Sequence, residues 1–354
     1  GITAKDQLKI LDGTFTIDAA NSAVKVKNTD DTELGNIYIA GGTFTIKAEQ
    51  DGFHATGSIV VDDGTITVKA GDDGFHADLD TVINGGTINV EESYEGLEGK
   101  RVVVNGGDIT VNSSDDGVNA ASSSSDGSTS GMMDGKEPPQ NSDGTDDDTT
   151  RPELPDGSDF DPDNAPSGGM RQGGPGVGGD SELYIKITGG TLTVSADGDG
   201  LDSNGSLLVT GGTTIVYGPT SDGDGALDYD GGATVTGGTL AAIGSAGMTQ
   251  GFGEDSTQPS ITYCCTETQS ADTTITLTDS KGNALFTVTP EKAYASIVLT
   301  FPDLTLDETY TLTAGTDTEE ITITDTLTTA GTQPTKTMGG GPGGGNMPNN
   351  GDSQ

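Results

Sequence analysis

Two short segments, GGTFTI at residues 41–46 and DGFHA at residues 51–55, decide the fold because they recur along the chain. The pair returns as DGTITV at 63–68 with DGFHA at 73–77, and again as GGTI at 85–88 with EGLE at 95–98. The second turn residue of each unit moves in equal steps from Gly42 to Gly64 to Gly86. Each coil therefore takes about 22 residues, and a fixed period of this size is the signature of a repeat architecture.

Apolar residues fall into columns when the repeats are aligned on that turn residue. Pairs placed two and four residues after it, such as Phe44/Ile46 and Ile66/Val68, alternate with polar residues, which is typical of strands with one buried face. Further apolar columns precede the turn and follow it, so each coil needs three sides. Three short strands per coil, joined by glycine-rich corners, predict an all-β parallel β-helix.

The repeat pattern is interrupted once and then ends. The interval from Gly107 to Gly190 is much longer than the others and corresponds to one coil plus an insert, so we expect the helix to resume in register. The end of a solenoid exposes unpaired backbone and apolar core, so a cap is expected there. The expected organisation is a first β-helix part at 1–121, a disordered acidic, Gly-, Pro- and Ser-rich insert at 122–181, a second β-helix part at 182–255, a small C-terminal β cap or β-sandwich-like element at 256–330 and a disordered tail at 331–354.

The chain is strongly acidic, with 15 basic and 56 acidic residues among 354 and a formal net charge of −41. Nucleic acid and anionic membranes are excluded as partners because both require a basic surface. No apolar run approaches the ~20 residues that span a bilayer, so we expect no membrane insertion by this chain. The surplus of carboxylates favours cations as ligands.

The N-terminus and the cysteines add two expectations. Residues 1–4 (GITA) match residues 52–55, so we expect the chain to begin inside a repeat, with an upstream part of the natural protein before it. Cys264 and Cys265 are adjacent, and adjacent side chains of a strand point to opposite faces. Two unpaired thiols are therefore the first interpretation, and a strained vicinal disulfide is the alternative.

The repeats stack acidic residues in a column at one corner of the coil. The column reads Asp51, Asp73, Glu95 and Asp116, and after the insert Asp199 and Asp224. Two unit charges about 5 Å apart repel by about 1 kcal/mol even in water, so such a column calls for neutralisation. Hard oxygen ligands in surplus favour Ca²⁺ over softer metals, whereas the alternative is a set of solvated turn aspartates. The calcium candidates are Asp51, Asp72, Asp73, Asp78, Glu95, Glu98, Asp115, Asp116, Asp199, Asp202, Asp224 and Asp228.

A second polar column lies three residues after the acidic one and reads His54, His76, Glu98, Asn119 and Asp202. It falls between two inward positions, so its side chains should point outward. Two histidines above a glutamate resemble a transition-metal set. Because the column drifts to Asn and Asp, exposed polar corner residues are the preferred interpretation.

Four motifs carry a resemblance to a known family, namely DDGFHA at 72–77, VINGGTI at 82–88, DDG at 115–117 and DGDGLD at 197–202. They resemble the clostridial carbohydrate-binding-domain family. The resemblance implies a right-handed, calcium-binding parallel β-helix on the bacterial cell surface, outside the cell, that binds cellulose or polygalacturonate. The motif departs at 95–98 and at 22–25, where the corner lacks its aspartate, so metal ligation at those two coils is in question. The resemblance covers about residues 1–250 and extends to the strand-rich segment at the C-terminal end.

The leading functional hypothesis is a non-catalytic, adhesin-like protein that holds plant-type or acidic polysaccharide. The chain contains no Trp, so recognition by stacking alone is not expected. Bound calcium would instead bridge to the carboxylates of acidic sugars. The candidate carbohydrate contacts are His54, His76, Tyr94, Lys100 and Arg101.

Two other functions remain open. A calcium-dependent polysaccharide lyase needs a cation to acidify the proton beside a uronate carboxylate and a basic residue to remove it. Lys100 and Arg101 beside Glu98 are expected to be the one place where basic residues meet the acidic corner, although a local salt-bridge role competes. The second alternative is a structural surface spacer without affinity for glycans. No residue is assigned a catalytic role.

Overall fold

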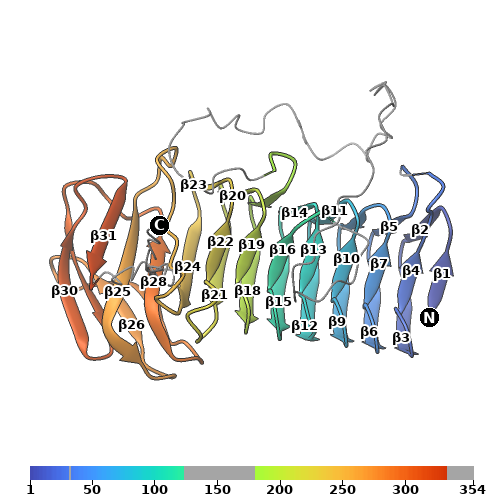
Figure 1. The fold of residues 1–354 in the computed structure, drawn as a ribbon, viewed down its shortest axis with the longest axis horizontal. Helices are drawn as coiled ribbons and strands as arrows, with labels where there is room; N and C mark the ends of the chain where they lie inside the picture. The colour runs from blue at the N-terminus through green and yellow to red at the C-terminus, as the bar shows by residue number, and fades with distance from the viewer. Residues whose placement is uncertain (32, 123–179, 333–354) are drawn as a thin grey trace, which may run out of the picture.

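The computed structural model describes residues 1–31, 33–122 and 180–332, and every regular element within them is a β-strand. The chain winds as a parallel β-helix with three strands in each coil, and the coils stack from the N-terminus towards a C-terminal β element (Figure 1). The expected all-β fold is confirmed. Most of the insert expected at 122–181 and of the tail expected at 331–354 lies outside the described residues, and the division into domains stays a prediction.

Sheets A and B each contain one strand from every coil, paired in parallel with the strands of the neighbouring coils. The strands of sheet A are β1 (Ile2–Ala4), β4 (Val24–Val26), β7 (Phe53–Ala55), β10 (Phe75–Ala77), β13 (Leu97–Gly99), β16 (Val118–Ala120), β19 (Leu201–Ser203) and β22 (Leu227–Tyr229). The strands of sheet B are β2 (Gln7–Ile10), β5 (Asn36–Ile39), β8 (Ile59–Val61), β11 (Asp80–Ile83), β14 (Arg101–Val104), β17 (Tyr184–Ile187), β20 (Ser206–Val209) and β23 (Gly232–Val235).

Sheet C holds the longer third strand of each coil and continues into the C-terminal element, which also carries the antiparallel sheet D. The strands of sheet C are β3 (Thr14–Ala19), β6 (Thr43–Ala48), β9 (Thr65–Ala70), β12 (Thr87–Glu92), β15 (Asp108–Ser113), β18 (Thr191–Ala196), β21 (Thr213–Tyr217), β24 (Thr239–Gly244), β28 (Tyr294–Thr300), β25 (Ser260–Gln269) and β31 (Leu327–Gly331). The strands of sheet D are β27 (Ala284–Val288), β26 (Ile275–Thr278), β29 (Thr309–Ala314) and β30 (Asp317–Thr322).

The register follows the sequence repeat on both sides of residues 123–179. Phe53 pairs with Phe75 in sheet A, and their rings stack with centroids 4.7 Å apart inside the helix. Val118 of β16 pairs with Leu201 of β19, so the strands after the gap continue the sheets in register, as expected. Like residues therefore lie above one another through most of the helix, and this places the polar columns as well as the core.

The tight corner between sheets B and C requires glycine because consecutive coils touch there through their backbones. Gly86 has a φ of 92°, in the left-handed region that other residues avoid. A Cβ atom at Gly86 would lie 2.7 Å from the carbonyl oxygen of Gly64 in the coil before. The repeated turn glycine is thus set by close stacking as well as by backbone conformation.

The C-terminal element covers the end of the helix by extending sheet C. Strand β28 pairs antiparallel with β24, the last helical strand of sheet C, so that edge is not left open. The last strand of sheet B is also covered, because the Gly253 and Thr257 amides donate to the Ala233 and Val235 carbonyls. The expected cap is confirmed. A second buried cluster, which includes Tyr294, forms its core.

Candidate metal centre

The acidic corner lies between sheets C and A, two residues before each strand of sheet A. Backbone hydrogen bonds between coils hold its residues in line, since the Gly52 amide donates to the Asp73 carbonyl and the Gly74 amide to the Glu95 carbonyl. We call this set the corner column, and its members are Asp51, Asp73, Glu95, Asp116 and Asp199.

The strand column lies beside the corner column, on the outward side of sheet A. Its residues stand in register from one coil to the next, and each lies between two inward-pointing positions of its strand. Its members are Lys25, His54, His76, Glu98, Asn119, Asp202 and Asp228.

Burial makes the corner column electrostatically costly. Asp51 and Asp73 are only 5% and 6% exposed. Burial, followed by repulsion from nearby carboxylates, raises the pKa of Glu95 to about 9 and that of Asp202 to about 8. Burial likewise raises the pKa of Asp116 to about 7, against hydrogen bonding from the Asp199 amide. The corner therefore holds more carboxylates than its own donors can stabilise in the charged form.

The corner between sheets B and C offers a contrast, because hydrogen bonds satisfy its polar side chains. Asn84 Nδ2 donates to Asp62 Oδ1 at 2.8 Å, and Asn105 Nδ2 donates to Asn84 Oδ1 at the same distance. The Thr188 hydroxyl then donates to Asn105 Oδ1, also at 2.8 Å. Amide and hydroxyl groups thus link four coils there without a surplus of charge.

In the part of the chain that the structure describes, four clusters along the acidic corner each bring three potential ligand atoms within 4.8 Å of one another. Three of the clusters offer oxygen only, and one contains a histidine nitrogen. The clusters are Asp51 with Asp72 and Asp73; Asp73 with His76 and Glu98; Glu95 with Asp115 and Asp116; and Asp116 with Asp199 and Asp202.

The histidines belong to the corner and are not the exposed polar residues that the sequence favoured. The side chains of His54 and His76 are 19% and 20% exposed, and their rings stack with centroids 4.8 Å apart. His54 Nδ1 lies 2.7 Å from Asp51 Oδ2. This contact and a hydrogen bond from Ser22 outweigh the effect of burial and lower the pKa of Asp51. In the coil before Asp51 the position of the acid is taken by Ser22, whose hydroxyl donates to Asp51 Oδ2. The corner column therefore ends at a neutral hydrogen-bond donor.

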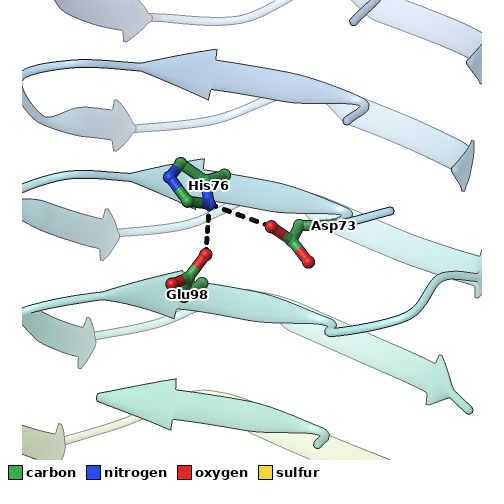
Figure 2. A group of neighbouring side chains, drawn as sticks. All are labelled: Asp73, His76 and Glu98. Carbon is green, nitrogen blue, oxygen red and sulfur yellow. Dashed lines mark hydrogen bonds and ion pairs between the residues drawn. The ribbon is translucent and has the colours of Figure 1, made fainter. Parts of the chain in front are cut away.

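His76 faces three carboxylates. Its Nδ1 contacts Asp73 Oδ2 at 2.9 Å and also Glu98 Oε2, as Figure 2 shows, while Nε2 lies 3.3 Å from Asp78 Oδ1. Burial favours the neutral ring, but these contacts raise the pKa of His76 to about 12. The predicted outward direction of this column is confirmed, although its side chains turn towards the corner.

Asn119 occupies the strand column between Glu98 and Asp202 and is only 8% exposed. Its Nδ2 donates to Glu95 Oε2 at 3.0 Å, whereas its Oδ1 is buried without a hydrogen-bond partner. A buried carbonyl oxygen without a donor is unusual, and it lies among carboxylates. The sequence placed Asn119 in the column but gave it no role as a ligand.

The last coil departs from the expected alignment. Leu201 pairs with Leu227, so the residue opposite Asp199 is Gly225, and Asp224 lies one position before it. The Gly225 amide donates to Asp199 Oδ1 at 2.5 Å. Placing Asp224 in the corner column was therefore wrong. The interval between these paired leucines is longer than the interval between Phe53 and Phe75. The extra residues move Asp224 out of line with Asp199.

Basic residues meet the acidic corner in more places than the sequence suggested. Lys25 stands in the strand column next to His54. Lys292 of the C-terminal element donates to Asp197 Oδ1 at 2.8 Å and to the Ala196 carbonyl at 2.6 Å. The expectation of a single basic site was therefore wrong. Nothing in the local sequence could have placed Lys292 there, because its partners lie far earlier in the chain.

The five candidate carbohydrate contacts come from different sides of the coil. Arg101 makes a two-pronged ion pair with Asp80, through Nε to Oδ1 and through Nη2 to Oδ2 at 2.9 Å, on sheet B. Lys100 lies in the turn before it. Tyr94 is 48% exposed at the rim of the acidic corner, and a hydrogen bond with Asp115 raises its pKa to about 12. Their roles, with those of the two histidines, stay predictions.

The thiols of Cys264 and Cys265 are unpaired and buried, which confirms the first interpretation of the sequence. Within the described residues there is no helix with the length and hydropathy needed to cross a membrane.

The model of a family described as carbohydrate-binding domain-containing protein matches residues 1–136. This confirms, over that part of the chain, the resemblance drawn from the repeats. No curated protein and no solved structure matches the chain significantly.

Proposed function

We propose that this chain is a non-catalytic carbohydrate-binding protein that works outside the cell, with Ca²⁺ bound along its acidic corner. The observation that carries the carbohydrate assignment is the family match over residues 1–136. These residues include four of the five members of the corner column, so the matched region holds most of the candidate ligands.

The oxygen-only clusters suit calcium. Two oxygen ligands each about 2.4 Å from one Ca²⁺ ion lie up to about 4.8 Å apart. The carboxylate atoms of Asp116, Asp199 and Asp202 already lie within 4.8 Å of one another. The unpartnered Asn119 Oδ1 beside Asp202 is a further hard oxygen of the kind that calcium prefers.

The ion would serve both the fold and the binding of a ligand. Each cluster joins residues of two neighbouring coils, so a bound cation would remove the repulsion between them and tie the coils together. Calcium accepts six to eight ligands, and three or four protein oxygens leave positions for oxygens of a sugar. A uronate carboxylate is the sugar group that a cation in an acidic protein would hold best. Acidic polysaccharide such as polygalacturonate is therefore the proposed ligand class.

The test is affinity electrophoresis of the full chain in gels that contain polygalacturonate, with Ca²⁺ and with EDTA. We expect retardation in Ca²⁺ and none in EDTA. Asp116→Asn should lose most of the retardation, because Asp116 belongs to two of the clusters. Asp63→Asn is the matched control, since Asp63 is an exposed turn residue whose Oδ1 accepts from the Gly64 amide, and the amide oxygen of Asn can do the same.

Other outcomes would select a different function. Formation of unsaturated sugar product from polygalacturonate would indicate the lyase. Calcium uptake without retardation by polygalacturonate or by cellulose would indicate a structural spacer. The ion pair of Arg101 with Asp80 favours the non-catalytic function, because the guanidinium is engaged on sheet B.

A further inference from the structure

The acidic corner changes its chemistry along the helix. At its N-terminal end the strand column carries His54 and His76, whereas from Glu98 onward it offers only oxygen atoms. Calcium prefers oxygen, and imidazole nitrogen suits ions such as Zn²⁺, Co²⁺, Ni²⁺ and Cu²⁺. One corner therefore presents two different kinds of ligand set.

The contacts of His76 cannot all be satisfied by its own protons. Its Nδ1 carries at most one hydrogen but faces oxygens of both Asp73 and Glu98 (Figure 2). One of these two carboxylate oxygens therefore receives no hydrogen bond from the ring. A cation placed between the three atoms would satisfy both carboxylates and the nitrogen lone pair together.

The second ring nitrogen of His76 faces a carboxylate, as it commonly does in histidines that bind a metal. His76 Nε2 lies 3.3 Å from Asp78 Oδ1, on the side of the ring away from Asp73 and Glu98. A histidine that binds a metal through one nitrogen commonly donates its other N–H to a carboxylate, which fixes the tautomer. Asp78 would hold the proton on Nε2, and the metal ion would replace the proton on Nδ1, which is released to solvent. The ring of His54, stacked on His76, limits its rotation.

We propose that Asp73, His76 and Glu98 form a binding site for a divalent transition-metal ion of the Zn²⁺ class. The site shares Asp73 with the oxygen-only cluster of Asp51 and Asp72 but differs from it by the imidazole ligand. The three ligand atoms lie within 4.8 Å of one another. Ligands about 2.1 Å from a shared Zn²⁺ ion lie at most about 4.2 Å apart, so only small side-chain movements are needed. Three protein ligands leave a fourth position for water or for a ligand oxygen.

The test is a Zn²⁺ titration of the full chain, freed of metal and then saturated with Ca²⁺, by calorimetry and by ¹H–¹⁵N spectra of the imidazole rings. The chain has only two histidines, so each ring nitrogen can be followed separately. We expect saturable Zn²⁺ binding that shifts the Nδ1 resonance of His76. Ca²⁺ alone should leave the ring nitrogens close to their positions in the metal-free protein.

Two variants and one control make the assignment specific. His76→Gln should lower the Zn²⁺ affinity by at least about tenfold. Glu98→Gln should also weaken it, and this change is mild because Asn119 shows that the column accepts an amide. His54→Gln is the matched comparison, since it removes the same residue type one coil earlier and leaves the three ligands in place. It loses only the stacking on His76, so it should weaken Zn²⁺ binding much less than His76→Gln does. Circular dichroism of each variant confirms the fold.

Three results would overturn the inference. They are Zn²⁺ binding of equal strength in His76→Gln and the unaltered chain, a His76 Nδ1 resonance that Zn²⁺ does not move, and displacement of Zn²⁺ by an equal concentration of Ca²⁺. None of them bears on carbohydrate binding, which is tested in the absence of Zn²⁺, so the two proposals can fail independently.

Discussion

The side-chain amide of Asn119 donates to Glu95 Oε2 at 3.0 Å and leaves its own Oδ1 buried without a partner. An unsatisfied buried carbonyl costs about 1–3 kcal/mol, so a ligand that supplies positive charge there is favoured. The relationship is specific to this coil, because the equivalent residues in neighbouring coils are Glu98 and Asp202.

We predict that Asn119→Ala weakens Ca²⁺ binding at the cluster of Asp116, Asp199 and Asp202. The variant removes the extra oxygen ligand while it keeps all three carboxylates. Calorimetric titration measures the effect, and Asn112→Ala on sheet C is the control, since Asn112 donates to a backbone carbonyl outside the corner. Equal affinities in the two variants would show that Asn119 is not a ligand.

The stability of the metal-free protein should fall as the pH rises. The folded-state pKa of Glu95, about 9, and that of Asp202, about 8, lie above their ordinary values of 4.5 and 3.8. Between these limits the folded state holds more protons than the unfolded state, so the free energy of unfolding decreases from about pH 4 to about pH 9. The raised pKa of His76 acts in the same direction above about pH 6.5.

Thermal unfolding in EDTA at several pH values tests this dependence. Each 1 kcal/mol lost should lower the Tm by about 2–4 °C. Saturating Ca²⁺ should restore the Tm most strongly at the high-pH end, because ligand carboxylates must be ionised to bind a metal. A Tm in EDTA that is constant or rises between pH 5 and pH 9 would contradict the electrostatic account of the corner.

The ion pair of Arg101 with Asp80 should contribute to stability and not to chemistry. Arg101→Ala leaves the Asp80 carboxylate, whose side chain is 14% exposed, without its two-pronged partner. We expect a loss of about 1–3 kcal/mol in the free energy of unfolding, measured with urea. Lys5→Ala breaks the exposed pair with Asp30 and should cost less than about 1 kcal/mol. Retention of glycan binding by folded Arg101→Ala would separate stability from function.

Gly86→Ala should destabilise the helix by about 1–3 kcal/mol, since the new Cβ would meet the Gly64 carbonyl oxygen at 2.7 Å in a backbone conformation with positive φ. Gly223→Ala is the control, because a Cβ at Gly223 would meet nothing within 4 Å. Urea unfolding of both variants makes the comparison. Equal stabilities would show that the coils can separate at this corner without cost.

The thiols of Cys264 and Cys265 should react with a thiol reagent such as DTNB only after unfolding. Both side chains are buried, and burial raises the pKa of Cys265 to about 12, so the reactive thiolate is scarce at neutral pH. We expect two reactive thiols in denaturant and almost none in buffer. Rapid reaction in buffer would mean that the C-terminal element opens readily.

The sequence alone determined the fold and the position of the acidic corner. In a solenoid, residues one period apart lie above one another, so the spacing from Asp51 to Asp73 already placed their carboxylates in neighbouring coils. The same reasoning correctly predicted that the helix resumes in register after the long interval that follows Gly107, where Leu201 pairs with Val118. It went wrong at Asp224, where a longer coil broke the period and brought Gly225 into line.

The tertiary structure decided what the corner residues do. The period fixes which residue stands above which, but it does not fix the rotamers or the contacts made with distant segments. The turn of His76 towards Asp73 and Glu98, and the orphaned Oδ1 of Asn119, depend on side-chain packing. The contact of Lys292 with Asp197 depends on where the C-terminal element attaches to sheet C. The sequence repeat therefore specified the β-helix, and only packing between distant segments and side chains specified the sites on it.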